Sequence, residues 1–199
     1  MIRYDCLKLL APLITDHLVL TSQSGQRIEW NELVSHDGNF LVGSMGNGLG
    51  VGIGLALALP HRKVIVLESD GSVLLSLFNL ATLGNVNPPN MKVFVFDNEA
   101  YSGTRISYPT ATAGKTDLAG MARAAGVTRA VTVRDIESFK KEGVEPLNEP
   151  GLRFVVCKVE ESLGHRKIPR PNFDPVENKY RFVRYLEQTE GRPIFLGRG

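Results

Sequence analysis

This chain contains few cysteines and few long apolar runs, and its positive and negative charges nearly balance. Its two cysteines, Cys6 and Cys157, lie far apart and form no C-x-x-C pair, which fits buried thiols in a reduced intracellular protein better than a disulfide framework. The formal net charge is only +2, so composition does not favour binding to nucleic acid. Hydrophobic residues make up 43% of the chain, which excludes a largely disordered protein.

Membrane-spanning and secretory segments are also missing from the pattern. Even the apolar stretch LGVGIGLALAL, at residues 49–59, is too short and too rich in glycine to span a bilayer. The first residues carry Asp5 and Lys8 within their apolar pattern and lack a small-residue cleavage site, so they do not resemble a signal peptide. We therefore expect a cytoplasmic protein without a membrane partner.

Common nucleotide-binding and metal-binding motifs are absent as well. Glycines recur at every second position of residues 46–54, which never gives the G-x-G-x-x-G spacing of a nicotinamide-binding domain. The stretch AGKT at residues 113–116 lacks the upstream glycine of a P-loop, because Pro109 stands there. The four histidines show no metal-ligand spacing, and the basic residues 61–63 are interpreted as a solvated turn.

What the sequence does contain is a regular alternation of strand-like and helix-like segments. This alternation predicts one α/β domain over residues 1–199, with an open, mostly parallel sheet covered by helices on both faces. The tail from about residue 161 is expected to be irregular and then helical. The expected strands are 18–20, 39–44, 63–69, 91–97, 129–133 and 153–160, and the expected helices are 3–15, 27–35, 73–86, 116–126, 135–143 and 177–190, with a glycine-dense helix after residue 44.

Polar residues follow two of the expected strands. Asp70, Gly71 and Ser72 lie between a strand and a helix, where backbone N–H groups and the helix dipole suit a phosphate group. Because Asp70 would repel a phosphate, its presence predicts a bridging divalent cation, most simply Mg²⁺. Asn98 follows the next strand, and adjacent parallel strands would bring Asp70 and Asn98 to the same edge of the sheet.

Together these stretches resemble a known motif. SDGS at 69–72 and DNEAYSG at 97–103 are similar to the G-D-G and N-N motif of thiamine diphosphate enzymes, and residues 40–59 resemble their segment that holds the aminopyrimidine ring. Other stretches, including TDLAGMARAAGV at 116–127 and YRFVRYLE at 180–187, resemble the beta subunit of sulfopyruvate decarboxylase and the matching domain of phosphonopyruvate decarboxylase. This resemblance covers most of the chain. It implies decarboxylation of a small anionic 2-oxo acid that depends on thiamine diphosphate and Mg²⁺.

The resemblance also implies a role for each matching position. Mg²⁺ would be held by the side chains of Asp70 and Asn98 and by the main-chain carbonyl of Ala100. The Met45 side chain would keep the cofactor bent, so that two of its reacting atoms lie close together. The implied cofactor contacts are Gly43, Ser44 and Met45 at the aminopyrimidine, and Gly71, Ser72, Tyr101 and Ser102 at the diphosphate.

The sequence departs from the family motif at a few positions. Ser69 replaces the first glycine of G-D-G, and Asp97 replaces the first asparagine of N-N, which adds negative charge near the expected metal. The stretch GTRISYPT also differs from the family pattern, and its Arg105 is either a contact for an anionic substrate or a surface residue.

These enzymes also need a glutamate from a separate pyrimidine-binding domain, for which 199 residues leave no room. The resemblance therefore implies an alpha subunit that supplies this glutamate, in a homodimer of this chain or in a heterotetramer or larger assembly. Alone, the chain is expected to be nearly inactive. Two alternatives remain open, namely a non-catalytic cofactor-binding or regulatory subunit, and a component of a carboligase similar to acetolactate synthase.

Overall fold

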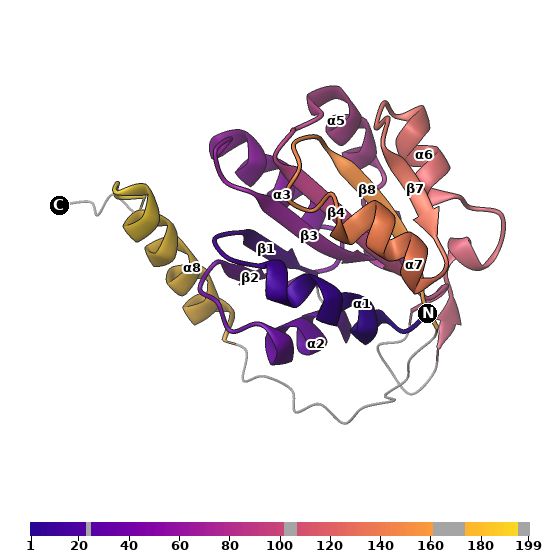
Figure 1. The fold of residues 1–199 in the computed structure, drawn as a ribbon, viewed down its shortest axis with the longest axis horizontal. Helices are drawn as coiled ribbons and strands as arrows, with labels where there is room; N and C mark the ends of the chain where they lie inside the picture. Colours follow the sequence, from indigo (N-terminus) through magenta and orange to yellow (C-terminus); the bar gives the residue numbers. More distant parts are fainter. Residues whose placement is uncertain (23–24, 102–106, 161–173, 195–199) are drawn as a thin grey trace.

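The computed structural model describes residues 1–22, 25–101, 107–160 and 174–194, and a single large sheet forms its centre (Figure 1). Six parallel strands lie in the order β2-β1-β3-β4-β8-β7. The predicted fold class, an open parallel sheet with helices on both faces, is confirmed. The strands are β1 (Leu18–Thr21), β2 (Asn39–Leu41), β3 (Val64–Ser69), β4 (Met91–Asp97), β7 (Ala130–Val133) and β8 (Arg153–Lys158).

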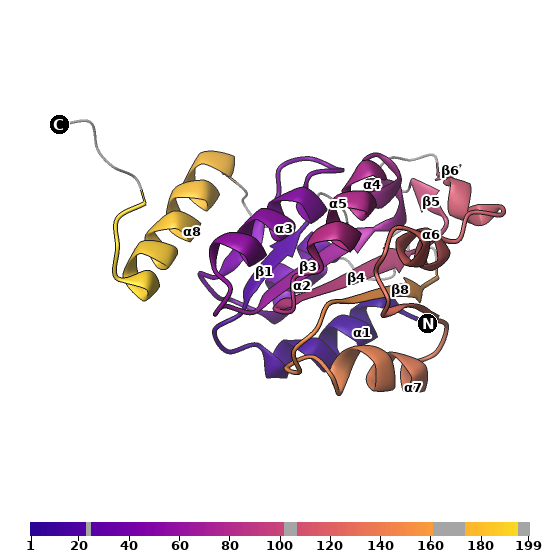
Figure 2. The same cartoon turned by 90° about the horizontal axis from the view of Figure 1, so that it is seen from above.

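Different helices bury the two faces of this sheet. The helices are α1 (Arg3–Leu10), α2 (Gly25–Leu33), α3 (Gly48–Ala58), α4 (Asp70–Leu74), α5 (Phe78–Val86), α6 (Leu118–Ala124), α7 (Ile136–Phe139) and α8 (Pro175–Glu190). Residues of α3, α5 and α6 pack in one apolar cluster and residues of α1, α2 and α7 in the other, and Figure 2 shows α3 and α5 on the opposite side of the sheet from α1 and α7. Neighbouring residues of β3, such as Ile65 and Val66, belong to opposite clusters because side chains alternate along a strand.

The central strands bring the predicted site residues to one edge of the sheet. β3 and β4 are nearly continuous apolar runs, as expected for strands covered on both faces. They pair in parallel, with Ser69 opposite Phe96, so they end at almost the same level. Asp70 and Asn98, which follow these strands, therefore emerge at the same carboxyl edge, as predicted.

Several predicted helix boundaries were wrong. The single helix expected over residues 73–86 is two helices, because α4 begins directly at Asp70 and hydrogen bonds between residues three apart tighten the chain between α4 and α5. The helix expected over residues 116–126 is shorter, because Asp117 is the N-cap of α6 and the helix ends at Ala124, shortly before Gly126 at φ 108°. α5 ends at Val86, and the next residue, Asn87, adopts a left-handed conformation at φ 43° that turns the chain before the two prolines.

A short hairpin next to the sheet was not predicted. Its antiparallel strands are β5 (Ala100–Tyr101) and β6 (Tyr108–Pro109). A 3₁₀ turn at Ala111–Ala113 follows the hairpin, and a second 3₁₀ turn occupies Ala11–Leu13. Residues Lys140–Val144, directly after α7, form a short π-helical segment. The hairpin returns the chain to the carboxyl edge of the sheet, beside Asp70.

Both cysteines are buried free thiols, as expected. They belong to the same apolar cluster although they are far apart in the sequence. Burial raises the pKa of Cys6 to about 12 and the pKa of Cys157 well above its usual value, so both stay protonated at neutral pH. Among the described residues, no helix combines the length and the apolar character that crossing a membrane requires.

Candidate functional site

Asp70 is the first residue of α4 and is fully buried at the carboxyl end of β3. Ser69, in extended conformation, caps this helix by accepting a hydrogen bond at Oγ from the Ser72 N–H, at 3.3 Å. The Thr110 hydroxyl donates to Asp70 Oδ2 at 2.6 Å, and the Thr112 hydroxyl lies 3.1 Å from the same oxygen. Thr110, which follows the hairpin, thus fixes the orientation of the Asp70 carboxylate, and Thr112 lies beside it.

The surroundings of Asp70 favour a bound cation. Burial raises the pKa of this carboxyl, and the negative charge of Asp97 raises it further, whereas the hydrogen bonds from Thr110 and Thr112 oppose the rise. A group that loses water and lies near a second carboxylate is stabilised in its charged form by an adjacent positive ion. Without such an ion, burial and the charge of Asp97 favour the neutral form of the Asp70 carboxyl.

Asp97 is also buried, and its charge is compensated within the protein. The Lys158 ammonium lies 2.7 Å from Asp97 Oδ2, and the Thr112 hydroxyl donates to Asp97 Oδ1 at 2.7 Å. Lys158 also contacts Glu99 at 2.7 Å. Burial lowers the pKa of Lys158, but its hydrogen bonds to Asp97 and Glu99 outweigh that effect and raise it, so the ammonium stays charged. The negative charge expected to disturb the metal site is thus neutralised by Lys158.

Asn98 and Ala100 flank a residue with unusual backbone geometry. Glu99, between them, has φ 61°, and its carbonyl accepts the Thr110 N–H at 3.0 Å. This bond attaches the end of the hairpin to the end of β4. A carboxylate, a side-chain amide oxygen and a main-chain carbonyl are oxygen donors of the kind that Mg²⁺ prefers, so the residues present fit the ion. Within the described ranges, no cluster of three His, Cys, Asp or Glu side chains offers an alternative metal site.

The loop between β2 and α3 lies against the start of α4. It bends at Gly43 and Ser44 and turns at Met45 and Gly46, where Gly46 has φ 85°. The Gly46 N–H donates to Ser72 Oγ at 2.8 Å, which joins this loop to the segment expected to hold the diphosphate. The structure therefore brings the two predicted cofactor segments into direct contact.

The individual side chains of these segments differ in accessibility. Ser72 is fully buried, and its hydroxyl accepts the bond from the loop rather than facing outward. Gly43 is exposed and Met45 is half-buried, while Ser44 Oγ accepts a bond from Asn47 at 2.7 Å. The predicted contact of Ser72 with a diphosphate would accordingly fall to its backbone.

Position 71 favours glycine because the Tyr101 ring occupies the space that a side chain would need. A Cβ at Gly71 would overlap the ring carbons of Tyr101. The half-buried Tyr101 thus packs against the N-terminal turn of α4, where the diphosphate contacts were predicted. Ser102 and Arg105, the other predicted contacts of this turn, lie outside the described residues.

Three residues of this site were missed from the sequence. Thr110 and Thr112 follow a proline, in a stretch whose sequence is typical of a loop. Lys158 is the last residue of β8, and the sequence did not show which strand lies beside β8. In the sheet Lys158 is the register partner of Asp97, which places their side chains together. Only knowledge of the strand order would have revealed this pair.

Glu68 is a further buried carboxyl close to the site. It is 1% exposed, and a Cβ added to Gly48 at the start of α3 would overlap its carboxylate. Burial raises the pKa of Glu68, and the nearby hydroxyls of Ser72 and Ser22 counteract this in part. The close approach explains why glycine begins α3.

Comparisons with known proteins agree with this geometry. The family model described as "Thiamine pyrophosphate enzyme, C-terminal TPP binding domain" matches residues 22–157. The chain is 30% identical over 187 residues to the sulfopyruvate decarboxylase subunit beta of Methanococcus maripaludis, covering 94% of this chain and 98% of that one. It is 34% identical over 130 residues to the corresponding subunit of Methanocaldococcus jannaschii, covering 64% of this chain and 65% of that one.

Longer proteins match over part of their length. The chain is 38% identical to the phosphonopyruvate decarboxylase of Streptomyces viridochromogenes, covering 90% of this chain but only 44% of that protein. The crystal structure of benzoylformate decarboxylase from Polynucleobacter necessarius superposes with a TM-score of 0.68 at 19% identity, over 81% of this chain and 33% of that one. This likeness shows a shared fold. The chain therefore belongs to the thiamine pyrophosphate enzymes, in which it corresponds to the C-terminal domain that binds the cofactor and is related to decarboxylase subunits.

Proposed function

We propose that this chain is the beta-type subunit of a cytoplasmic decarboxylase that depends on thiamine diphosphate and Mg²⁺. Its substrate would be a small anionic 2-oxo acid similar to sulfopyruvate or phosphonopyruvate, because relatives over most of the chain carry those names. The observation that carries the proposal is the buried Asp70 carboxylate, which the Thr110 hydroxyl orients at the carboxyl edge of a family-matching domain. Binding sites of parallel α/β sheets lie at this edge.

Different residues of the site would bind different parts of the cofactor. Asp70, Asn98 and the Ala100 carbonyl would bind Mg²⁺ through oxygen, and the start of α4 would present its N–H groups to the diphosphate. The loop before α3, held by the bond from Gly46 to Ser72, would orient the aminopyrimidine end. The bound cofactor would supply the electron sink for decarboxylation. The proposed contacts are Gly43, Ser44, Met45, Gly71, Ser72, Tyr101 and Ser102.

The proposal includes a second kind of subunit. The M. maripaludis relative, named subunit beta, matches this chain over nearly its whole length, whereas the longer phosphonopyruvate decarboxylase has more than half of its length unmatched. An alpha subunit with a pyrimidine-binding domain and its glutamate would correspond to that unmatched part. Two copies of each chain, or a larger assembly, would complete the sites.

Calorimetry tests the cofactor site directly. Thiamine diphosphate is titrated into the purified chain with and without Mg²⁺, and with and without a candidate alpha subunit. We expect Mg²⁺-dependent binding that Asp70→Ala abolishes. Asp117→Ala, which removes an exposed carboxylate at the start of α6, serves as the matched control and should bind normally. Binding that is unaffected by Asp70→Ala contradicts the assigned metal site.

Product analysis of the reconstituted complex separates the alternatives. Carbon dioxide and an aldehyde in equal amounts support decarboxylation, whereas a condensed hydroxy-oxo acid indicates a carboligase. Cofactor binding without turnover of any 2-oxo acid, in the presence of the alpha subunit, indicates a non-catalytic cofactor-binding or regulatory subunit.

A further inference from the structure

A cavity of about 230 Å³ lies at the amino ends of β3 and β4, the opposite end of the sheet from Asp70. Its walls come from the turn at residues 60–63, from Pro89 and Asn90 before β4, and from residues 147–150 before β8. Apolar groups form much of the lining, including Val64, Ile65 and Leu147. The cavity has no residue in common with the candidate cofactor site.

A buried lysine faces this cavity. Lys92, on β4, is 4% exposed, and its ammonium donates to the main-chain carbonyls of Glu149 at 2.7 Å and Gly151 at 2.6 Å. An ammonium has three N–H donors, and the part of the chain that the structure describes gives the third one no partner. Burial, and then the charge of Arg153, lower the pKa of Lys92 to about 8. The charge of the Glu149 carboxylate opposes this lowering only in part, so the Lys92 ammonium is incompletely compensated.

A second lysine and a histidine complete the polar part of the lining. The Lys63 ammonium donates to Asn148 Oδ1 at 2.8 Å, and His17 Nε2 lies 3.1 Å from the same oxygen. Burial and the charge of Lys63 lower the pKa of His17, which keeps this buried imidazole neutral. Two carboxylates lie near these groups. Glu149 lines the cavity and lies 3.6 Å from Arg153, and Asp16 lies 4.0 Å from His17 Nδ1 and interacts with Lys63. Lys63, Lys92 and Arg153 together still carry one more charge than these two carboxylates.

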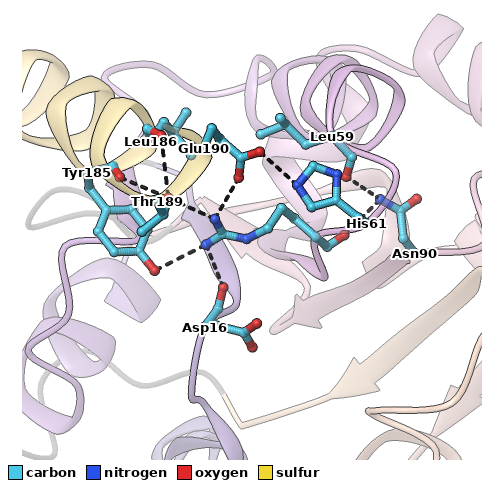
Figure 3. A network of polar contacts seen from close by, with 9 residues as sticks. Asp16, Leu59, His61, Asn90, Tyr185, Leu186, Thr189 and Glu190 are labelled. Carbon is cyan, nitrogen blue, oxygen red and sulfur yellow. Dashed lines mark hydrogen bonds and ion pairs between the residues drawn. The ribbon is translucent and has the colours of Figure 1, made fainter. Parts of the chain in front are cut away.

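The neighbouring arginine does not contribute to this charge. Figure 3 shows the network in which Glu190 and Thr189, from the end of α8, lie beside the turn that carries His61. Arg62 donates to Glu190 at 2.8 Å and to the Asp16 carbonyl at 2.9 Å. Its guanidinium therefore forms its hydrogen bonds toward α8 and not toward the cavity. The Asn90 side-chain nitrogen, also drawn in Figure 3, lies within hydrogen-bond distance of three main-chain carbonyls, which share its two N–H groups and hold this wall of the cavity in place. The cavity is therefore formed by anchored segments.

We propose that this cavity binds a small organic carboxylate, with the anionic group between Lys63 and Lys92 and its carbon atoms against Val64, Ile65 and Leu147. The neutral His17 imidazole accepts the Thr15 N–H at 3.3 Å and contacts Asn148, so it would support the wall of the cavity rather than bind the ligand. The cavity holds the volume of roughly seven or eight water molecules, which limits the ligand to a few carbon atoms. Charge-assisted hydrogen bonds from two ammonium groups would supply the specificity for an anion.

Nuclear magnetic resonance of the ¹⁵N-labelled chain tests this site with succinate as the probe. The titration is performed without thiamine diphosphate or Mg²⁺, and sodium chloride at equal ionic strength is the reference. We expect saturable shifts of the Asn90, Asn148 and Gly151 amide signals, which persist when thiamine diphosphate and Mg²⁺ are then added. Succinate shifts no larger than those of sodium chloride would mean that the lysines are only screened, and they would overturn the proposal.

Two variants distinguish a specific binding site from a general attraction of anions to basic residues. Lys63→Met removes an exposed ammonium whose loss leaves the core intact, and it should weaken succinate binding about tenfold. Lys115→Met, at an exposed position after the hairpin, is the matched control and should leave the affinity unchanged. Equal weakening by both variants, or shifts confined to residues 70–72 and 97–100, would show that the cavity is not the binding site. Loss of the cofactor site in the calorimetric test would not affect this result.

Discussion

At the residue scale, one threonine hydroxyl lies between two buried carboxylates. Thr112 Oγ1 is 2.7 Å from Asp97 and 3.1 Å from Asp70, and a hydroxyl has one proton to donate. The shorter contact assigns this proton to Asp97, while Thr110 donates to Asp70. The remaining negative charge needs positive ions, which Lys158 supplies for Asp97 and a metal would supply for Asp70.

Replacing Lys158 should therefore be costly. Lys158→Met leaves the buried Asp97 carboxylate without its counter-charge, and we expect the free energy of unfolding to fall by about 3 kcal/mol. Urea denaturation measures the change. The double variant with Asp97→Asn should recover most of the loss, because the uncompensated charge is then gone.

An exposed ion pair provides the control for this experiment. Lys140→Met removes a lysine that lies 2.8 Å from Glu137 on the surface, and its effect should stay below about 1 kcal/mol. If Lys158→Met costs no more than Lys140→Met, Lys158 does not neutralise Asp97 in the way described.

The buried Lys92 predicts a specific dependence of stability on pH. Its pKa is about 8 in the folded protein against a usual 10.5, so between these values the unfolded chain binds a proton that the folded protein lacks. Stability relative to Lys92→Met should be constant below pH 8 and should rise from pH 8 to 10.5, by up to about 3 kcal/mol. Chemical denaturation of both proteins across this range measures the difference. A difference that falls or stays flat with rising pH would refute the lowered pKa.

At the element scale, α8 completes the edge of the sheet. Phe182 packs on Phe40 of β2 with ring centroids 5.0 Å apart, and Leu186 is buried in the same cluster. The Asn178 side chain accepts from the Leu41 N–H at 3.2 Å and donates to the Leu41 carbonyl at 3.0 Å. This amide satisfies backbone groups that an edge strand would otherwise leave open to pairing with other chains.

Asn178→Ala should open this edge. The variant removes both bonds to Leu41, and we expect a loss of about 1–3 kcal/mol in stability because a buried backbone pair is left unsatisfied. Hydrogen exchange should show the Leu41 amide exchanging faster than in the unaltered chain. Gln188→Ala, at an exposed position on the same helix, should change neither quantity. Unchanged exchange at Leu41 would show that Asn178 does not protect the strand.

The end of α8 also corrects the interpretation of residues 61–63. The turn was expected to be solvated, and His61 and Lys63 are exposed as predicted. Arg62, however, is buried and joins the helix through Glu190, Thr189 and the Tyr185 hydroxyl. His61 adds a 2.7 Å contact to Glu190 (Figure 3). The basic composition of the turn was visible in the sequence, but the acidic partner lies more than a hundred residues away.

At the scale of the whole molecule, the proposed activity depends on a second chain. In the proposed function, the described residues of the site would hold and orient the cofactor, and the alpha subunit would supply the glutamate. We expect the purified chain with thiamine diphosphate and Mg²⁺ to release carbon dioxide from sulfopyruvate at least about a hundredfold more slowly than the reconstituted complex. A coupled aldehyde assay measures both rates. Equal rates with and without the alpha subunit would contradict the division of the site between two chains.

The sequence by itself determined the fold class and the places of the principal site residues. Alternating strand and helix patterns require a parallel sheet, and residues directly after strands, such as Asp70 and Asn98, must then lie at its carboxyl edge. These conclusions need only local periodicity and the direction of the strands. The resemblance to thiamine diphosphate enzymes added the loop at residues 43–45.

Only the tertiary structure decided which distant residues complete these features. Lys158 reaches Asp97 because β8 lies beside β4, Thr112 reaches both carboxylates because the hairpin returns to the sheet, and Arg62 is buried because α8 covers its turn. Strand order, the hairpin and the position of α8 follow from packing of the whole chain rather than from any local pattern. The sequence shows which side chains carry a charge, whereas their burial and their partners are set only when the chain folds.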